Sequence, residues 1–155
     1  MSGTENGQAP RRFVSAAEQD DVVRAVLSRL NTCPSLPAGA LRYQLLEAGV
    51  PNMALRIVQG TYKTKEYILG GYKAQLDFSI AYRVQPADSG NLRLEADADL
   101  NALADWAADP ANAPALGERF CNVSIKQNSR ARLIAAWDTG DEDHSVELNL
   151  TYEVI

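Results

Sequence analysis

Carboxylates gather around the only histidine of the sequence. Asp138, Asp141, Glu142 and Asp143 all come shortly before His144. Oxygen ligands of this kind suit Ca²⁺ or Mg²⁺, but the spacing does not match the calcium-loop pattern D-x-[DN]-x-[DN]-G. The polar composition of a turn between two strands explains the same cluster. We therefore interpret the segment as a solvated hairpin turn and keep a metal site as the less favoured alternative.

Nucleophilic catalysis would have to use the same imidazole, because the chain has no second histidine. Cys33 and Cys121 stand far apart, and the sequence contains neither a C-x-x-C pair nor a G-x-S-x-G elbow. Carboxylate pairs such as Asp97 with Asp99 are predicted on a solvated helix face, where nothing raises a carboxyl pKa towards that of an acid catalyst. We expect no catalytic residues, no metal and no cofactor, and hence a protein that is not an enzyme.

Tyrosines and lysines alternate around a predicted turn at Tyr62, Lys63, Lys65, Tyr67, Tyr72 and Lys73. Proteins that bind single-stranded nucleic acid use this mixture for base stacking and phosphate contact. An edge hairpin also uses lysines to discourage unwanted strand pairing, while its tyrosines cover apolar neighbours. We favour the edge hairpin. Because amphipathic tyrosines on a projecting hairpin suit protein–protein contacts, it is a candidate interface.

Composition limits the class of protein. The chain has 155 residues, 46% of them hydrophobic, and a net charge of -5, which suits one globular domain and disfavours general nucleic-acid binding. No apolar run approaches the roughly 18 residues of a membrane-spanning helix. We expect residues 1–12 to form a flexible N-terminal tail without a secretory signal, and residues 13–155 to form a single domain.

Two helices are predicted from their caps and apolar spacing. Ser15 and Glu18 form an S-x-x-E capping box at the start of a helix that extends to about residue 31. A second helix begins at Asp88 or Ser89 and ends before Pro110.

Alternation of apolar and polar residues predicts strands in the intervening segments, at residues 53–58, 61–67, 72–84, 120–126, 132–137 and 146–155. Residues 41–46 fit either a helix or a strand. No internal repeat at a fixed period is visible. This order of elements predicts an α+β fold in which a mixed, largely antiparallel β-sheet packs against two main α-helices.

Four segments of the chain occur in an order that suggests a family. They are Leu30-Asn31-Thr32-Cys33-Pro34-Ser35-Leu36, Phe78-Ser79-Ile80-Ala81-Tyr82-Arg83, Leu103-Ala104-Asp105-Trp106 before Pro114-Ala115-Leu116, and Leu148-Asn149-Leu150-Thr151-Tyr152. The series resembles the minor capsid proteins of tailed bacteriophages and prophages, which are similar to tail terminators, over about residues 15–155.

The resemblance implies a virion structural protein. Its subunits would form a ring of six that caps the tail tube, halts tube polymerisation and joins the tube to the head-completion or connector protein. The protein would then be assembled in the bacterial host cytoplasm and reside at the head–tail junction. DNA would be passing cargo only, and no membrane would be contacted.

A head-to-tail ring needs two different complementary patches on every subunit. We expect the hairpin at 61–72 to form one patch, and the acidic region with Asp141 and Asp143 to meet it across the interface. Replacing Lys63 and Lys65 with Glu is then expected to abolish the ring. Two alternatives stay open: a small-molecule-binding or enzymatic α+β domain with a pocket between the second helix and the sheet, and a single-stranded nucleic-acid-binding module.

Overall fold

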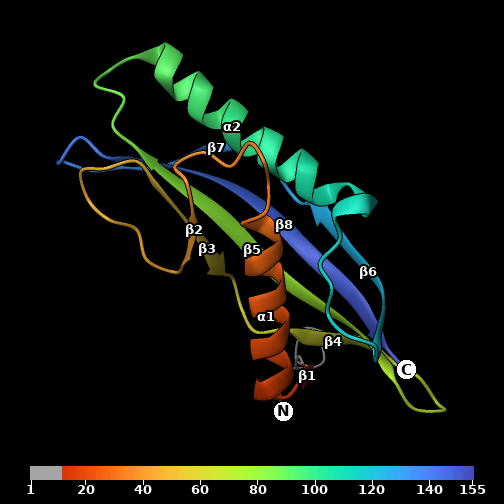
Figure 1. Cartoon of the computed structure of the whole chain (residues 1–155). Coiled ribbons are helices and arrows are strands. Elements are labelled where there is room, and N and C mark those ends of the chain that lie inside the picture. The colour runs from red at the N-terminus through yellow and green to blue at the C-terminus, as the bar shows by residue number, and fades with distance from the viewer. Residues whose placement is uncertain (1–11) are drawn as a thin grey trace, which may run out of the picture.

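The computed structural model describes residues 12–155, which form an α+β fold as predicted (Figure 1). The elements in chain order are β1 (Arg12–Phe13), α1 (Ala16–Leu30), β2 (Leu41–Tyr43), β3 (Asn52–Ile57), β4 (Tyr62–Glu66), β5 (Tyr72–Val84), α2 (Gly90–Ala108), a 3₁₀ turn (Pro110–Asn112), β6 (Phe120–Gln127), β7 (Arg132–Ala136) and β8 (Glu142–Val154). The expected N-terminal tail lies outside the described residues except for Arg12, which pairs with Lys63 in the sheet.

Both helices begin at side-chain caps. The Ser15 hydroxyl accepts the backbone N–H of Glu18 at 3.2 Å, and the Ser89 hydroxyl accepts that of Leu92 at 3.2 Å. Each bond satisfies one of the backbone donors that a helix start leaves without an intrahelical partner. The predicted start of α1 is confirmed, and of the two predicted caps for α2 the structure uses Ser89.

Two long strands form the centre of the sheet. β5 and β8 pair antiparallel over their whole length, from Tyr72 opposite Val154 to Val84 opposite Glu142. β4 and β3 follow one another along the outer edge of β5, and β6 and β7 do the same along β8. β1 and β2 then extend the β4 and β3 side, with β2–β3 as a parallel pair. The ladder with β5 is the reason that β8 begins at Glu142 rather than at the predicted residue 146.

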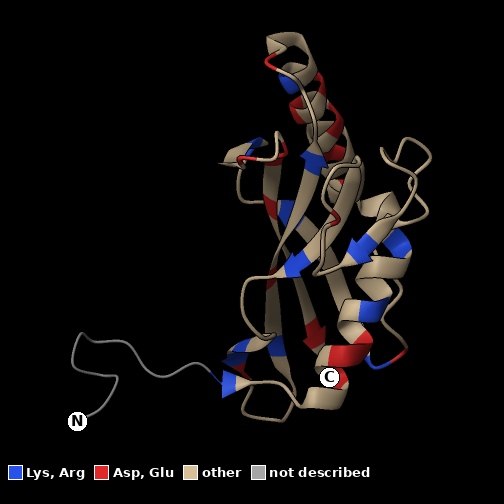
Figure 2. Ribbon diagram, turned by 90° about the vertical axis from the view of Figure 1, so that its left-hand side faces the viewer, with Lys and Arg blue, Asp and Glu red and all other residues tan. Residues whose placement is uncertain are grey.

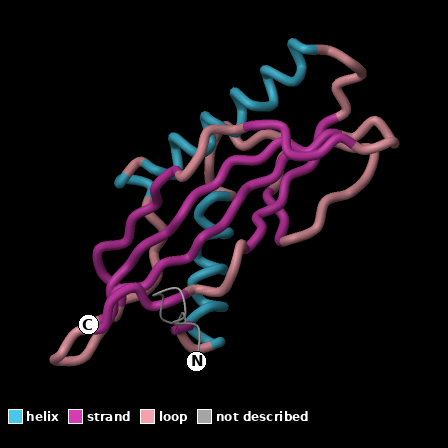
Figure 3. The backbone as a smooth tube through the Cα atoms, turned by 180° about the vertical axis from the view of Figure 1, so that it is seen from behind, coloured by secondary structure: helices cyan, strands magenta, loops and turns pink. Residues whose placement is uncertain are grey.

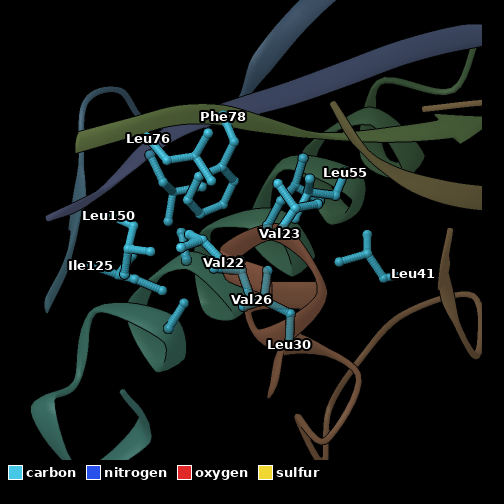
Figure 4. Packing of buried hydrophobic residues seen from close by; sticks show 14 of the residues in the cluster. Val22, Val23, Val26, Leu30, Leu41, Leu55, Leu76, Phe78, Ile125 and Leu150 are labelled. Carbon is cyan, nitrogen blue, oxygen red and sulfur yellow. The ribbon is translucent and has the colours of Figure 1, made fainter. Parts of the chain in front are cut away.

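One face of the sheet is packed against the helices. Side chains of α1, α2 and the inward positions of β3, β5, β6 and β8 form one hydrophobic cluster, with Val22, Phe78 and Leu100 at 0% exposure (Figure 4). The opposite face carries the polar residues of the alternating strands, such as Asp77 and Asn149. Figure 3 views the molecule with this uncovered face towards the reader and α1 behind the sheet.

The sheet contains one strand pattern twice. β4 begins at Tyr62 and β7 at Arg132, a spacing of 70 residues, and the same spacing separates Tyr72 from Glu142 at the starts of β5 and β8. Phe78 and Leu148 are also 70 residues apart and lie directly opposite one another. A pseudo-two-fold axis therefore passes through this central pair.

We call residues 52–84 and 122–154 the two units of the sheet. Their strand ladders also shift register at equivalent positions. The ladder of β4 with β5 shifts register between Lys63 and Lys65, and that of β7 with β8 shifts at the counterparts Leu133 and Ala135. The expectation of no internal repeat was wrong. Between residues 52–84 and 122–154 the identical positions are Asn52 and Asn122, Gly70 and Gly140, Tyr82 and Tyr152, and Val84 and Val154. Several other core positions exchange one apolar residue for another, such as Leu55 and Ile125 or Phe78 and Leu148, which preserves the fold but hides the repeat from inspection.

Candidate interaction surfaces

The hairpin between β4 and β5 projects beyond the sheet close to the C-terminus (Figure 1). Its turn is closed by hydrogen bonds from the Tyr67 N–H to the Gly71 carbonyl and from the Gly70 N–H to the Tyr67 carbonyl, both 3.1 Å. Gly70 has φ 92°, which a residue with a side chain adopts only with strain. Ile68 and Leu69 are 102% and 99% exposed. We call residues 67–71 the hairpin tip.

The three tyrosines of the predicted interface use their hydroxyls inside the subunit. Tyr62 is buried and donates to Asp77 at 3.2 Å. Tyr67 donates to Glu153 at 2.6 Å, and Tyr72 donates to Glu18. We call β4 and the first residues of β5, from Tyr72, the hairpin stem. These bonds fix the stem to the rest of the subunit. Rings held in this way make a poor platform for stacked bases.

The lysines of the hairpin concentrate positive charge on its stem. Lys63 lies over the ring of Tyr72, 4.5 Å from the centroid, and 3.9 Å from the Glu66 carboxylate. Lys65 and Lys73 are exposed and stand opposite one another in the ladder. Like charges directly opposite in a sheet repel. Glu153 on β8 stands opposite Lys73 and offsets part of this charge, and the remaining positive charge favours an external anionic partner.

A buried carboxylate ties α1 to this end of the sheet. Glu18 is 4% exposed and accepts the Tyr152 hydroxyl at 2.6 Å, the Tyr72 hydroxyl, and Arg119 Nη2 at 2.7 Å. The carboxylate of the predicted capping box is therefore directed into the fold rather than back to Ser15. Burial and the bond to Glu18 raise the pKa of Tyr72 to about 12 and raise that of Tyr152 further.

The acidic segment around the β7–β8 turn is largely buried, so the expectation of a solvated turn was wrong for its second half. Asp143 is 1% exposed, and its carboxylate accepts two hydrogen bonds from Arg83, at 2.6 and 2.9 Å, and one from Trp137 Nε1 at 3.1 Å. Burial alone would raise the pKa of Asp143, but these bonds hold it below its ordinary value. Asp138 stays exposed in the turn itself.

Asp141 is 2% exposed and links the same turn to a distant loop. It accepts Gln85 Nε2 at 2.9 Å, the Thr139 hydroxyl at 2.9 Å and the Gly49 N–H at 3.1 Å. The Gln85 bond and the Thr139 and Gly49 bonds outweigh burial and lower its pKa. Because the carboxylates of both predicted interface acids are engaged inside the subunit, we no longer assign Asp141 and Asp143 to a contact between subunits.

His144 is buried among charged neighbours. Its Nδ1 lies 2.7 Å from Asp97 and its Nε2 lies 3.5 Å from Glu142, which is itself paired with Arg93 at 2.6 Å. The arginine pairing and the imidazole lower the pKa of Glu142. Within residues 12–155, no three His, Cys, Asp or Glu side chains are grouped so that they could hold a metal ion.

A groove runs between α2 and the end of β5, at the place where a pocket was expected for the small-molecule alternative. It measures about 250 Å³ and is lined by Pro51, Tyr82, Val84, Gln85, Pro86, Leu92, Glu95, Ala96 and Asp99. Small-molecule sites usually measure roughly 300–1,000 Å³, so this groove is small for a ligand. Leu92 of α2 is 44% exposed here. We call this hollow the α2 groove.

Two carboxylates on the α2 groove lack a cationic partner. Glu95 and Asp99 are four residues apart on α2, and no Lys or Arg among residues 12–155 lies within ion-pair distance of either. Burial, and then the charge of Glu95, raise the pKa of Asp99. The expectation that nothing perturbs a carboxyl group on this helix was wrong for Asp99, because the end of the sheet partly covers it.

Charge is distributed unequally over the molecule (Figure 2). α2 contains four acidic residues and a single arginine. At the opposite end, β1, β4 and the start of β5 contain Arg12, Lys63, Lys65 and Lys73 against Glu66, and Glu153 of β8 stands opposite Lys73, which leaves these strands with an excess of positive charge. The two ends of the molecule are therefore electrostatically unlike.

Sequence reasoning found the hairpin stem and the general place of the α2 groove, but it missed the tip residues Ile68 and Leu69 and the residues that line the groove. The tip did leave a signal, because two large apolar residues directly before Gly70-Gly71 are unusual in a tight turn. No local sequence signal marks the residues that line the groove, because the groove forms only where α2 extends past the end of β5 in the folded chain.

Neither a family model nor a curated protein matches the chain. Among the described residues, no helix is both long enough and apolar enough to cross a membrane.

Proposed function

We propose that the chain is a structural subunit of a tailed-phage virion, similar to a tail terminator, which assembles head to tail into a ring at the head–tail junction. Six copies would cap the tail tube, and the other face of the ring would meet the head-completion or connector protein. Genome DNA would pass through the ring as cargo.

The observation that carries this proposal is the pair of unlike surfaces at opposite ends of one rigid sheet. A closed ring is built from heterologous contacts, in which one patch meets a different patch on the next copy. The hairpin tip with its basic stem and the acidic α2 with its groove satisfy this requirement. The sequence segments that resemble phage minor capsid proteins support the particular assembly.

Mixing the protein with purified tail tubes tests the function. We expect electron micrographs to show a cap at one end of each tube and a narrow distribution of tube lengths. A matched sample with Leu69→Asp should leave the tubes uncapped, whereas Leu45→Asp, an exposed residue on another loop, should cap them. Uncapped tubes of unlimited length with the wild-type protein would contradict the proposal.

A further inference from the structure

We propose that the hairpin tip of one copy inserts into the α2 groove of a second copy, with Ile68 and Leu69 in the groove and the stem lysines against its carboxylates. This inference names the contact on which the proposed ring depends, and so it rests on the proposed self-assembly.

Within residues 12–155, nothing covers the side chains of Ile68 and Leu69 at the tip. Ile68 and Leu69 are fully exposed, while their counterparts in the second unit, Asp138 and Thr139, belong to a turn whose last residue is bonded to the loop at Gly49. Tight turns usually carry polar residues. Two adjacent, fully exposed aliphatic side chains at a turn offer an apolar contact point to another molecule.

The tip cannot reach the groove of its own subunit. β5 begins next to the tip at Tyr72 and, after 13 residues in all, ends in the wall of the groove at Val84. An extended strand of this length spans ~40 Å. Any tip that occupies the groove must therefore come from another chain, and each copy keeps one free tip and one free groove for its neighbours.

Charge selects a second copy as the occupant. Lys65 and Lys73 repel one another across the hairpin stem, and Glu95 and Asp99 repel one another along α2. Bringing the two pairs together adds lysine–carboxylate attractions that offset both repulsions, beyond what Glu153 opposite Lys73 already provides within the subunit. The raised pKa of Asp99 is consistent with a carboxylate that gains from a nearby cation.

The size of the groove fits the same occupant. Its volume of about 250 Å³ is small for a ligand but suits two aliphatic side chains, and Leu92, Pro86 and Val84 provide apolar contact. Since the tip ends in Gly70 and Gly71, its backbone can approach the groove without a side chain in the way.

Complementation between two defective variants tests the contact. Ile68→Asp/Leu69→Asp removes the tip and leaves the groove intact, and Glu95→Lys/Asp99→Lys does the opposite. We expect each variant alone to be monomeric in sedimentation velocity. Their mixture should form one-to-one dimers and nothing larger. The intact tip of one variant fills the intact groove of the other, and the tip and groove that remain are both mutated.

Control variants separate this contact from a general effect of charge. Leu94→Asp lies on α2 outside the groove, and Asp21→Lys lies on α1; both positions are exposed. Both controls should assemble as the wild type does, with circular dichroism showing that every variant is folded. Loss of assembly in the controls, or no dimer in the mixture, would overturn the inference.

Disulfide capture decides the case if the free protein associates only weakly. In a Cys121→Ser background, with Cys33 buried, a Leu69→Cys chain should cross-link to a Leu92→Cys chain but not to a Leu94→Cys chain. Equal cross-linking to both, or to neither, would overturn the inference.

Failure of the tip–groove contact can be distinguished from failure of the proposed function. Tail tubes capped by wild-type protein, together with tip and groove variants that still assemble, would refute the contact and leave the function standing. A specific tip–groove disulfide in a protein that never caps tubes would do the reverse.

Discussion

The two units of the sheet share a backbone and differ in what surrounds it. Residues 12–13 form β1 and cover the outer edge of β4. Their counterparts 70 positions later, Tyr82 and Arg83, are the end of β5 and cannot cover β7. In the described chain β7 thus pairs only with β8, and Leu133 and Ile134 are each 46% exposed.

The turns of the two units differ in the same manner. Gly70 and Gly140 have φ 92° and 90°, so the two turns have one backbone geometry. One turn is apolar and bare, while the other ends in Asp141, which is bonded to a distant loop. The repeated strand pattern therefore has one turn that is hydrogen-bonded within the subunit and one turn that is exposed.

The largest predicted effect concerns the centre that both units share. Phe78→Ala should lower the free energy of unfolding by ~3–5 kcal/mol and Leu148→Ala by ~2–5 kcal/mol, because each leaves a cavity at a fully buried position. Urea unfolding followed by circular dichroism measures both. A loss under ~1 kcal/mol for one of them alone would show that the two units do not contribute equally to the core.

The two ends of the sheet should respond differently to loss of an arginine. Arg83→Met removes the donors of buried Asp143 and should cost ~1–3 kcal/mol of unfolding free energy. Arg119→Met should cost under ~1 kcal/mol, because Arg119 is 58% exposed and Glu18 keeps its tyrosine donors. The same denaturation assay compares them, and equal losses would contradict the distinction between the ends.

Substitution at the equivalent turn glycines should have nearly the same effect in both units. Gly70→Ala and Gly140→Ala should each cost ~1–2 kcal/mol, since φ is positive and no atom lies within 4 Å of the added Cβ. Thermal unfolding of the two variants tests this. A much larger loss for Gly140→Ala would mean that packing, rather than backbone strain, dominates at the second turn.

The smallest effects on stability are expected at the extremes of pH. At acid pH the group concerned is the Asp143 carboxylate. Burial opposes the low pKa of Asp143, but the Arg83 and Trp137 bonds hold it below the ordinary value of about 3.9. Its contribution to stability is complete above that pH and is lost as the pH falls through the lowered pKa. Asp143→Asn should flatten the stability profile below pH ~4, and an unchanged slope in urea unfolding would refute this assignment.

The opposite end should be sensitive to alkali. Burial and the bond to Glu18 raise the pKa of Tyr72 to about 12, above the ordinary value of about 10. Its contribution is complete below pH ~10 and is lost as the pH rises towards the raised pKa. Tyr72→Phe should reduce the loss of stability in this range, whereas Tyr43→Phe, at an exposed tyrosine, should leave it as in the wild type.

Local signals accounted for most elements. Alternation over residues 72–84 predicted β5 with its observed bounds, and Ser15 predicted the start of α1, because both depend on neighbours within a few residues. β1 and the first residues of β8 escaped prediction. A two-residue strand has no periodicity, and the acidic start of β8 reads as a turn until β5 is placed beside it.

The candidate site was predictable in part. The hairpin residues Lys65 and Tyr67 were found because residue type alone marks them, whereas Glu95 and Asp99 matter only because the end of β5 meets α2. Asp141 and Asp143 were misassigned, since Gln85 and Arg83, their partners, lie 56 and 60 residues away in the chain.

The sequence by itself determined the α+β class, the cap of the first helix, the alternating faces of the long strands and the net charge of -5. These follow from side-chain periodicity and composition, which are properties of short segments. Only the tertiary structure decided that the pattern occurs twice, which carboxylates are buried, and which turn is left bare. Those outcomes depend on contacts between residues far apart in the chain, and similar apolar residues can satisfy such contacts in many combinations.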